Sequence, residues 1–480
     1  MRSPSASPAG KQLYAVPEAP GRDLDTFFPI PIEVMERVLV SCSPRDVVVF
    51  ASTCRLAYMM VFDFADQHLW RELFFSSPFD DPRPALRVKT NDETLSIDWR
   101  RKMIERSRAK WVVQSFQTRS CQTSRALEAF IDMVHDMSPG AQTSPQAQSH
   151  NVEWLERVLR DSDLLNVEPD IPRSEAMPYA QLRAYLALSF DKGHNDTSRL
   201  RLVSRRKQSR IYVYNFRNYF GRHFGPFLDD GSADWIHIEH LVNVMVLNLR
   251  QLPGIWSNIK PPLGLPAIRP YSVLTNGRET PRDWARVEGT WRRYVSFMDF
   301  RDLFGSSPFC YFSRPTSSLR ESSITLAFNF YNNRQIDPTF FDCPRFREAT
   351  RLLELKFYLI DAEKSCFRDE LRRYGPQNVN EKFPPLYFAG SSQAFTGSEA
   401  SVEGVVHMTP DGVVRWQFTS VHPEGARWCS DGAQVGNIAS ATGVVGVWTT
   451  EYRHKDDAIG PFWLWKVRDD FPVQLMEYSR

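Results

Sequence analysis

The chain lacks the cysteine patterns of a disulfide frame or a zinc site. No C-x-x-C occurs, and the cysteines are odd in number: Cys42, Cys54, Cys121, Cys310, Cys343, Cys366 and Cys429. This usage predicts free thiols in a reducing compartment. A long apolar run is also missing, since the strongest, residues 241–249, is interrupted by Asn and is too short to span a bilayer. The N-terminus has no apolar signal core, so we expect a cytoplasmic or nuclear protein that is not secreted.

Motifs of catalysis are missing as well. The sequence has no G-x-S-x-G elbow, no phosphate-binding P-loop, no G-x-G-x-x-G fingerprint and no H-E-x-x-H. His237 and His240 have the spacing of a metal pair on a helix, but no third ligand lies nearby, so ordinary polar helix positions are favoured. We therefore expect a non-enzyme with no catalytic residue, cofactor or metal.

Charge of one sign is not in excess. The 59 Lys and Arg against 57 Asp and Glu give a net charge of +2, which argues against a nucleic-acid or membrane partner. A local basic run is better explained as a solvated connector, with an acidic or phosphorylated peptide as the alternative ligand: Arg199, Arg201, Arg205, Arg206, Lys207 and Arg210. A polar loop near the C-terminus is solvated or lines a pocket mouth: Glu451, His454, Asp456 and Asp457.

What is present is a compact helical pattern between residues 30 and 73. Pro31 precedes an apolar stripe, and Ser43 and Asp46 have the spacing of a capping box, with Pro44 at the first helical position. Three short helices are expected, closing at Leu69 and Trp70. A module this small cannot bury all its apolar residues, so part of its surface should meet a partner.

The order of these blocks resembles an F-box. The matching segments are Ile30-Pro31-Ile32-Glu33-Val34, Val38-Leu39, Ser43-Pro44-Arg45-Asp46-Val47-Val48, Thr53-Cys54-Arg55 and Leu69-Trp70. Cys42 and Ala57 depart from the pattern, each with less apolar bulk than is usual there. The resemblance implies a Skp-family adaptor as partner and, through it, a cullin. The contacts that it implies are Ile30, Pro31, Val34, Leu39, Pro44, Val47 and Val48.

The rest of the chain changes character along its length. The predicted layout is a disordered tail (1–24), the F-box (25–78), a helical connector (79–198) with a flexible loop (138–150), a mixed α/β connector (199–278) and a β domain (279–470). Residues 210–214 alternate like a strand, whereas residues 235–249 favour a buried helix. The fold class is therefore α+β.

The β domain is predicted from alternation and turns. Leu353, Leu355, Phe357 and Leu359 repeat with period two, and Thr409-Pro410-Asp411-Gly412 separates two strands as a hairpin turn. Glycines within strands favour closure into an antiparallel barrel, with a two-sheet sandwich as the alternative. The whole layout resembles large fungal F-box proteins of mushroom-forming fungi, and in architecture an animal F-box receptor with a calycin-like barrel.

Tryptophans in this domain are expected mostly in the core, with an aromatic-lined cavity as the alternative. The candidate substrate contacts are Trp428, expected in an exposed loop, Arg427, Trp416 and Trp448. The resemblance implies a substrate-recognition subunit of an SCF-type (Skp–cullin–F-box) ubiquitin ligase that acts on an unknown protein. The alternatives are an F-box adaptor outside ubiquitination and a ligand-binding or hydrolytic barrel tethered by an F-box.

Overall fold

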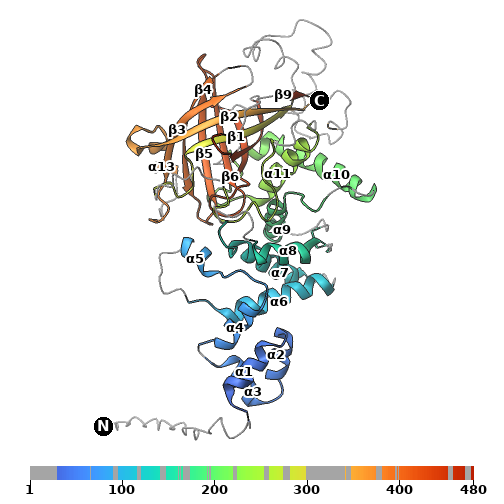
Figure 1. Cartoon of the computed structure of the whole chain (residues 1–480). Helices are drawn as coiled ribbons and strands as arrows, with labels where there is room; N and C mark the ends of the chain where they lie inside the picture. The colour runs from blue at the N-terminus through green and yellow to red at the C-terminus, as the bar shows by residue number, and fades with distance from the viewer. Residues whose placement is uncertain are drawn as a thin grey trace, which may run out of the picture. The chain divides into compact units, whose positions relative to one another are not determined.

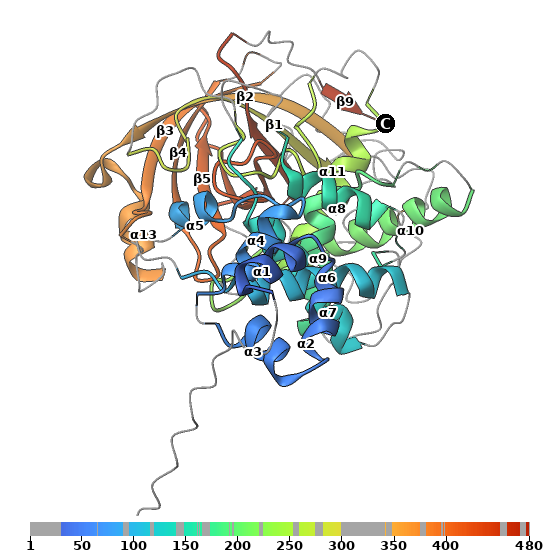
Figure 2. The same cartoon turned by 60° about the horizontal axis from the view of Figure 1, so that its bottom comes forward.

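The structure is a computed structural model, drawn in Figures 1 and 2. It describes residues 30–64, 66–89, 96–115, 120–140, 148–160, 162, 164–165, 173–191, 193, 196–219, 224–252, 259–273, 282–298, 341, 348–374, 381–394, 397, 399–451, 458–470 and 477–479. The chain divides into two compact units, Met1–Ser76 and Ser77–Arg480. The predicted tail 1–24 lies outside the described residues.

The first unit contains four helices in its described part: α1 (Ile32–Val40), α2 (Pro44–Ala51), α3 (Arg55–Phe62) and α4 (His68–Ser76). The predicted cap of α2 is present, because Ser43 Oγ accepts from Asp46 N at 3.2 Å. A fourth helix, α4, follows the three expected helices and contains Leu69 and Trp70. Trp70 is buried, and its indole N–H donates to Val61 O at 2.7 Å, fixing α4 against α3.

Most helices in the described part of the second unit precede the barrel. They are α5 (Arg83–Lys89), α6 (Trp99–Ser115), α7 (Ser120–His135), α8 (His150–Arg160), α9 (Arg173–Leu186), α10 (Asp196–Val213), the 3-10 turn η2 (Phe216–Tyr219) and α11 (Trp235–Leu249). Packing runs from α6 onto α7, from α7 onto α9, and from α9 and α10 onto α11. The predicted helix at 235–249 is confirmed, and it is buried on nearly every side because it also packs against strands β7 and β8.

The prediction of a strand at residues 210–214 is wrong, because residues 210–213 form the end of α10 and Tyr214 follows in a turn. Ser209 and Val213, four residues apart, are the buried positions of this helix. Alternation over five residues is too short to outweigh the helical stretch before it. In the described part of 199–278 the only β feature is an isolated bridge between Phe227 and Ala233.

The C-terminal part is a closed barrel of eight antiparallel strands. They are β1 (Gly289–Met298), β2 (Glu348–Ile360), β3 (Leu386–Gln393), β4 (Glu399–Met408), β5 (Val414–Val421), β6 (Arg427–Gln434), β7 (Val444–Thr450) and β8 (Ile459–Lys466). Each strand pairs with the next, and β1 closes the barrel by pairing with β8, with Trp291 opposite Lys466. The barrel prediction is confirmed, and the sandwich alternative is wrong because the sheet has no break.

Three short elements complete the described part: η6 (Ala362–Lys364), α13 (Phe367–Tyr374) and β9 (Glu477–Ser479). Figure 2 shows α13 beside the barrel wall and β9 at the far end of β2. Among the described strands, β9 pairs with β2 alone. No helix of the described residues has both the length and the apolar character needed to cross a bilayer.

Side chains fill the barrel. Aromatic rings pack in its centre, with Trp291 against Trp416 at 4.9 Å between ring centroids and Phe357 against Phe388 at 4.7 Å. Glycines in the wall make room for them, since a Cβ on Gly404 would lie 2.5 Å from the Phe388 ring. An eight-stranded barrel has an interior just wide enough to be filled in this way.

Candidate functional site

The first unit has a closed core of its own. Leu39, Val47, Ala57, Trp70 and Phe74 are all buried in it. These five residues come from all four helices, so each helix contributes to the packing of the unit. Burial of Ala57 also shows that its small side chain affects internal packing rather than a contact surface.

Several other apolar residues are exposed on α1, α2 and α3. Val34 and Val38 lie one helical turn apart on α1 and are 48% and 55% exposed. Val48 and Val49 on α2 and Tyr58 and Met59 on α3 are exposed as well. Isolated exposed apolar residues are ordinary, but this many on three short helices is typical of an interaction surface. We call these six residues the apolar set of the first unit.

The contacts predicted from the sequence divide into three groups in the structure. Ile30, Pro31, Val34 and Val48 are exposed, whereas Pro44 is half-buried. Leu39 and Val47 are only 4% and 0% exposed, so they hold the helices together and do not reach a partner directly.

Sequence reasoning missed Val38, Val49, Tyr58 and Met59 as exposed contacts. A signal was available, because Val47, Val48 and Val49 are consecutive, and one helix cannot bury three consecutive side chains on one face. Because Val47 points into the core, the side chains of Val48 and Val49 must point away from it.

The barrel residues proposed as substrate contacts do not form an open site. Trp416 and Trp448 are buried in the core of the barrel. Trp428 was expected in a loop, but it lies on β6, half-buried, with its ring 5.3 Å from that of Trp448. Alternation along β6 turns it toward the barrel interior, which explains the difference. Arg427 is exposed and pairs with Glu451 at 2.7 Å.

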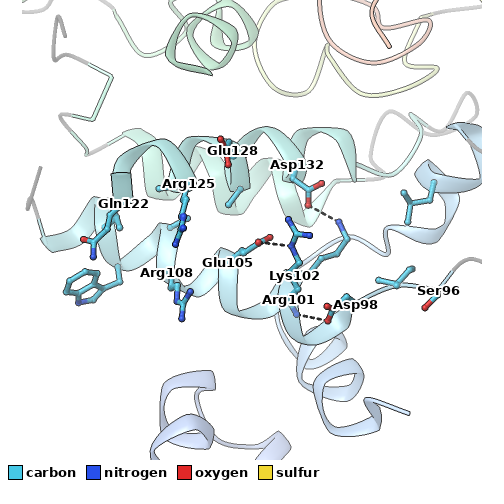
Figure 3. A pocket seen from close by; sticks show the side chains of 17 residues that line it. Ser96, Asp98, Arg101, Lys102, Glu105, Arg108, Gln122, Arg125, Glu128 and Asp132 are labelled. Carbon is cyan, nitrogen blue, oxygen red and sulfur yellow. Dashed lines mark hydrogen bonds and ion pairs between the residues drawn. The ribbon is translucent and has the colours of Figure 1, made fainter. Parts of the chain in front are cut away.

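A surface pocket of about 1100 Å³ lies between α6 and α7. Its apolar floor includes Ala109, Val112 and Ala126, and Trp111 on its lining is 49% exposed. Figure 3 shows charged side chains of both signs around it. Two of them form an ion pair, Lys102 Nζ with Asp132 Oδ2 at 2.8 Å. The balanced charges give this pocket no preference for a cationic or an anionic ligand.

Several of the remaining sequence candidates have structural roles. Arg205 pairs with Asp191, and Arg210 with the buried Glu348, which anchors α10 to the barrel. Burial lowers the pKa of His237 to about 3 and that of His240 to about 4, so both are neutral at pH 7. Among the described residues no group of three or more His, Cys, Asp or Glu is placed to hold a metal ion. Of the polar loop, residues 452–457 lie outside the described residues.

Comparison with known proteins gives no relative. No protein-family model, no curated protein and no solved structure matches the chain.

Proposed function

We propose that this chain is the substrate-recognition subunit of an SCF-type ubiquitin ligase. The first unit would be an F-box that docks on a Skp-family adaptor, and the second unit would recruit a protein substrate. The observation that supports the proposal best is the apolar set of the first unit, which stays exposed although all four helices bury other apolar residues.

The proposed contact surface is a revision of the one expected from the sequence. Val34 and Val38 on α1, with Val48 and Val49 on α2, would bury their side chains against the adaptor. Leu39 and Val47 would act indirectly, by fixing the helices that carry these residues.

No catalytic group is required of this chain. In a receptor of this class the rate comes from holding a substrate lysine near a charged ubiquitin-conjugating enzyme, which is an effect of proximity. A hollow ligand receptor is less well supported, because aromatic rings fill the described barrel interior.

Binding of the full-length chain to a recombinant Skp-family adaptor tests the proposal. Val34→Asp combined with Val38→Asp should weaken binding at least tenfold, because each change places a carboxylate in an apolar contact. Both residues are half-exposed, so the helical signal and the thermal midpoint should stay those of the wild type.

Arg71→Ala, at an exposed position of α4, is the matched control and should bind like the wild type. The proposal fails if the wild-type chain does not bind the adaptor, or if the double variant binds it equally well. Co-assembly with a cullin then separates a ubiquitin ligase from an adaptor complex that acts outside ubiquitination.

A further inference from the structure

Buried arginines in the described part of the chain follow a pattern with one exception. Four arginines are at most 4% exposed. Three of them pair with a carboxylate, in the pairs Arg106–Asp136, Arg292–Glu354 and Arg415–Asp431. The fourth, Arg293, has no carboxylate partner among the residues that the structure describes. This matters because removing a guanidinium from water is costly unless an anion compensates its charge.

Arg293 points into the barrel. Alternation along β1 places it on the same side as Trp291 and Val295, which belong to the barrel core. Its guanidinium carbon lies 5.0 Å from the centroid of the Phe418 ring and 4.6 Å from that of Phe462. The two rings offer a partial electrostatic compensation, but they are not counter-ions.

Hydrogen bonds do not satisfy this side chain either. Nη2 donates to Ser430 Oγ at 2.7 Å, whereas the buried Nε donates to no acceptor. A guanidinium has five N–H groups, and at least the one on Nε is buried here without an acceptor. Burial lowers the pKa of Arg293 to about 9, which leaves the charge in place at pH 7.

Two further polar groups on the same lumen lack partners. The buried indole nitrogen of Trp416 and the hydroxyl of Ser420 make no hydrogen bond. Both residues lie on β5 on the same face as Phe418. An indole N–H only donates, and a hydroxyl can donate. The interior therefore offers a positive charge and unused donors, which an acceptor with a negative charge would satisfy.

The packing limits the size of such an acceptor. A Cβ added to Gly446 would lie 2.7 Å from the Phe462 ring, and one on Gly432 would lie 2.8 Å from it. Phe462 thus lies close against the wall, so we expect the space beside Arg293 to admit only a ligand of a few atoms.

From these contacts we infer that the barrel interior binds a small monovalent anion, a halide ion or a carboxylate of the size of formate, against the guanidinium of Arg293 and beside Ser430. This site is independent of the proposed ligase function, because it concerns the stability of the barrel and not the docking of a partner. Its ligand stabilises the folded state, to which alone it binds.

Thermal unfolding of the full-length protein at constant ionic strength tests the inference. The protein is first dialysed into gluconate, an anion too large for the interior, which is then replaced stepwise by chloride, bromide or formate. Tryptophan fluorescence reports the barrel, because Trp291 and Trp416 lie in its core. As the small anion replaces gluconate, the thermal midpoint should rise by a few degrees and then level off when the site is saturated. A response to chloride and bromide alone identifies a halide site, and a response to formate identifies a carboxylate site.

Arg293→Met should abolish the rise, because it keeps an unbranched apolar chain and removes the charge. Arg201→Met, at an exposed arginine of α10, should keep the wild-type rise and controls for general effects of salt. The inference is overturned if the wild-type midpoint does not depend on these anions, or if Arg293→Met responds as the wild type does.

A direct observation covers the case in which Arg293→Met does not fold. Wild-type crystals grown in bromide should show anomalous scattering in contact with the guanidinium of Arg293. Absence of that signal in a well-ordered barrel would also overturn the inference.

Discussion

Replacing Asp431 by Asn removes the carboxylate charge of a buried ion pair on the outer wall of the barrel. Arg415 on β5 donates through Nε to Asp431 Oδ1 on β6 at 2.9 Å, and a second bond joins Nη2 to Oδ2. Asp431 is fully buried. The segment around Gly225 covers it so closely that a Cβ there would lie 2.5 Å from Asp431 Cγ. Phe227 covers the guanidinium, with 4.1 Å between its ring centroid and the guanidinium carbon.

The expected cost follows from this burial. Asn keeps the shape of Asp431 but removes the carboxylate charge that faces the buried guanidinium of Arg415, and breaking a buried pair in this way costs about 3–5 kcal/mol of unfolding free energy. Combining Asp431→Asn with Arg415→Met removes both charges, so the double variant should recover most of that loss. The coupling between the two positions should then exceed about 2 kcal/mol.

Urea unfolding of the full-length chain, followed by tryptophan fluorescence, measures these values in the transition of the second unit. Glu451→Gln is the matched control, because it breaks the exposed pair with Arg427, and it should leave the midpoint unchanged. A cost below about 1 kcal/mol for Asp431→Asn would refute the reasoning, since it would mean that water reaches the pair.

Two further predictions concern the barrel and the helices that pack on it. Gly446→Ala should lower the stability of the second unit by at least about 2 kcal/mol, because the new Cβ would lie 2.3 Å from the backbone oxygen of Asp431, and the thermal midpoint checks this. His237, His240 and His407 are buried, and burial lowers their pKa values to about 3, 4 and 4. The unfolded chain therefore takes up protons first, so stability should be complete above pH 6.5 and fall toward pH 4, by up to about 1.4 kcal/mol per pH unit for each histidine. Urea midpoints measured from pH 7.5 to pH 5 check the slope, which His240→Gln should reduce; a midpoint independent of pH would contradict this assignment.

Local signals in the sequence predicted much of the barrel. The turn Thr409–Gly412 forms as expected, with Gly412 at a φ of 81° and its N–H donating to Thr409 O at 3.0 Å. Residues 353–359, whose apolar side chains repeat with period two, lie in β2, where Phe357 is buried and Tyr358 is exposed. In both cases the information lies within a few residues of the chain.

Features that depend on distant segments were not predictable. Arg292 and Arg293 are adjacent on β1, so one of them had to point into the barrel, but only the pairing with β2 and β8 decides which one does. Trp428 has loop-like neighbours, Gly425 and Ala426 before it, yet pairing with β5 and β7 makes it part of a strand. The burial of Val47 likewise follows from how α2 packs on α3.

Closure of the barrel has a consequence for its synthesis. The strand β1 needs two partners, and one of them, β8, is the last of the barrel strands to leave the ribosome. Until then β1 and β7 each expose an unpaired edge, and such edges pair readily with other chains. The pairing of Trp291 with Lys466 is also a contact of long sequence separation, which slows folding. A nascent chain of this protein therefore spends its most aggregation-prone interval just before translation of the barrel is complete.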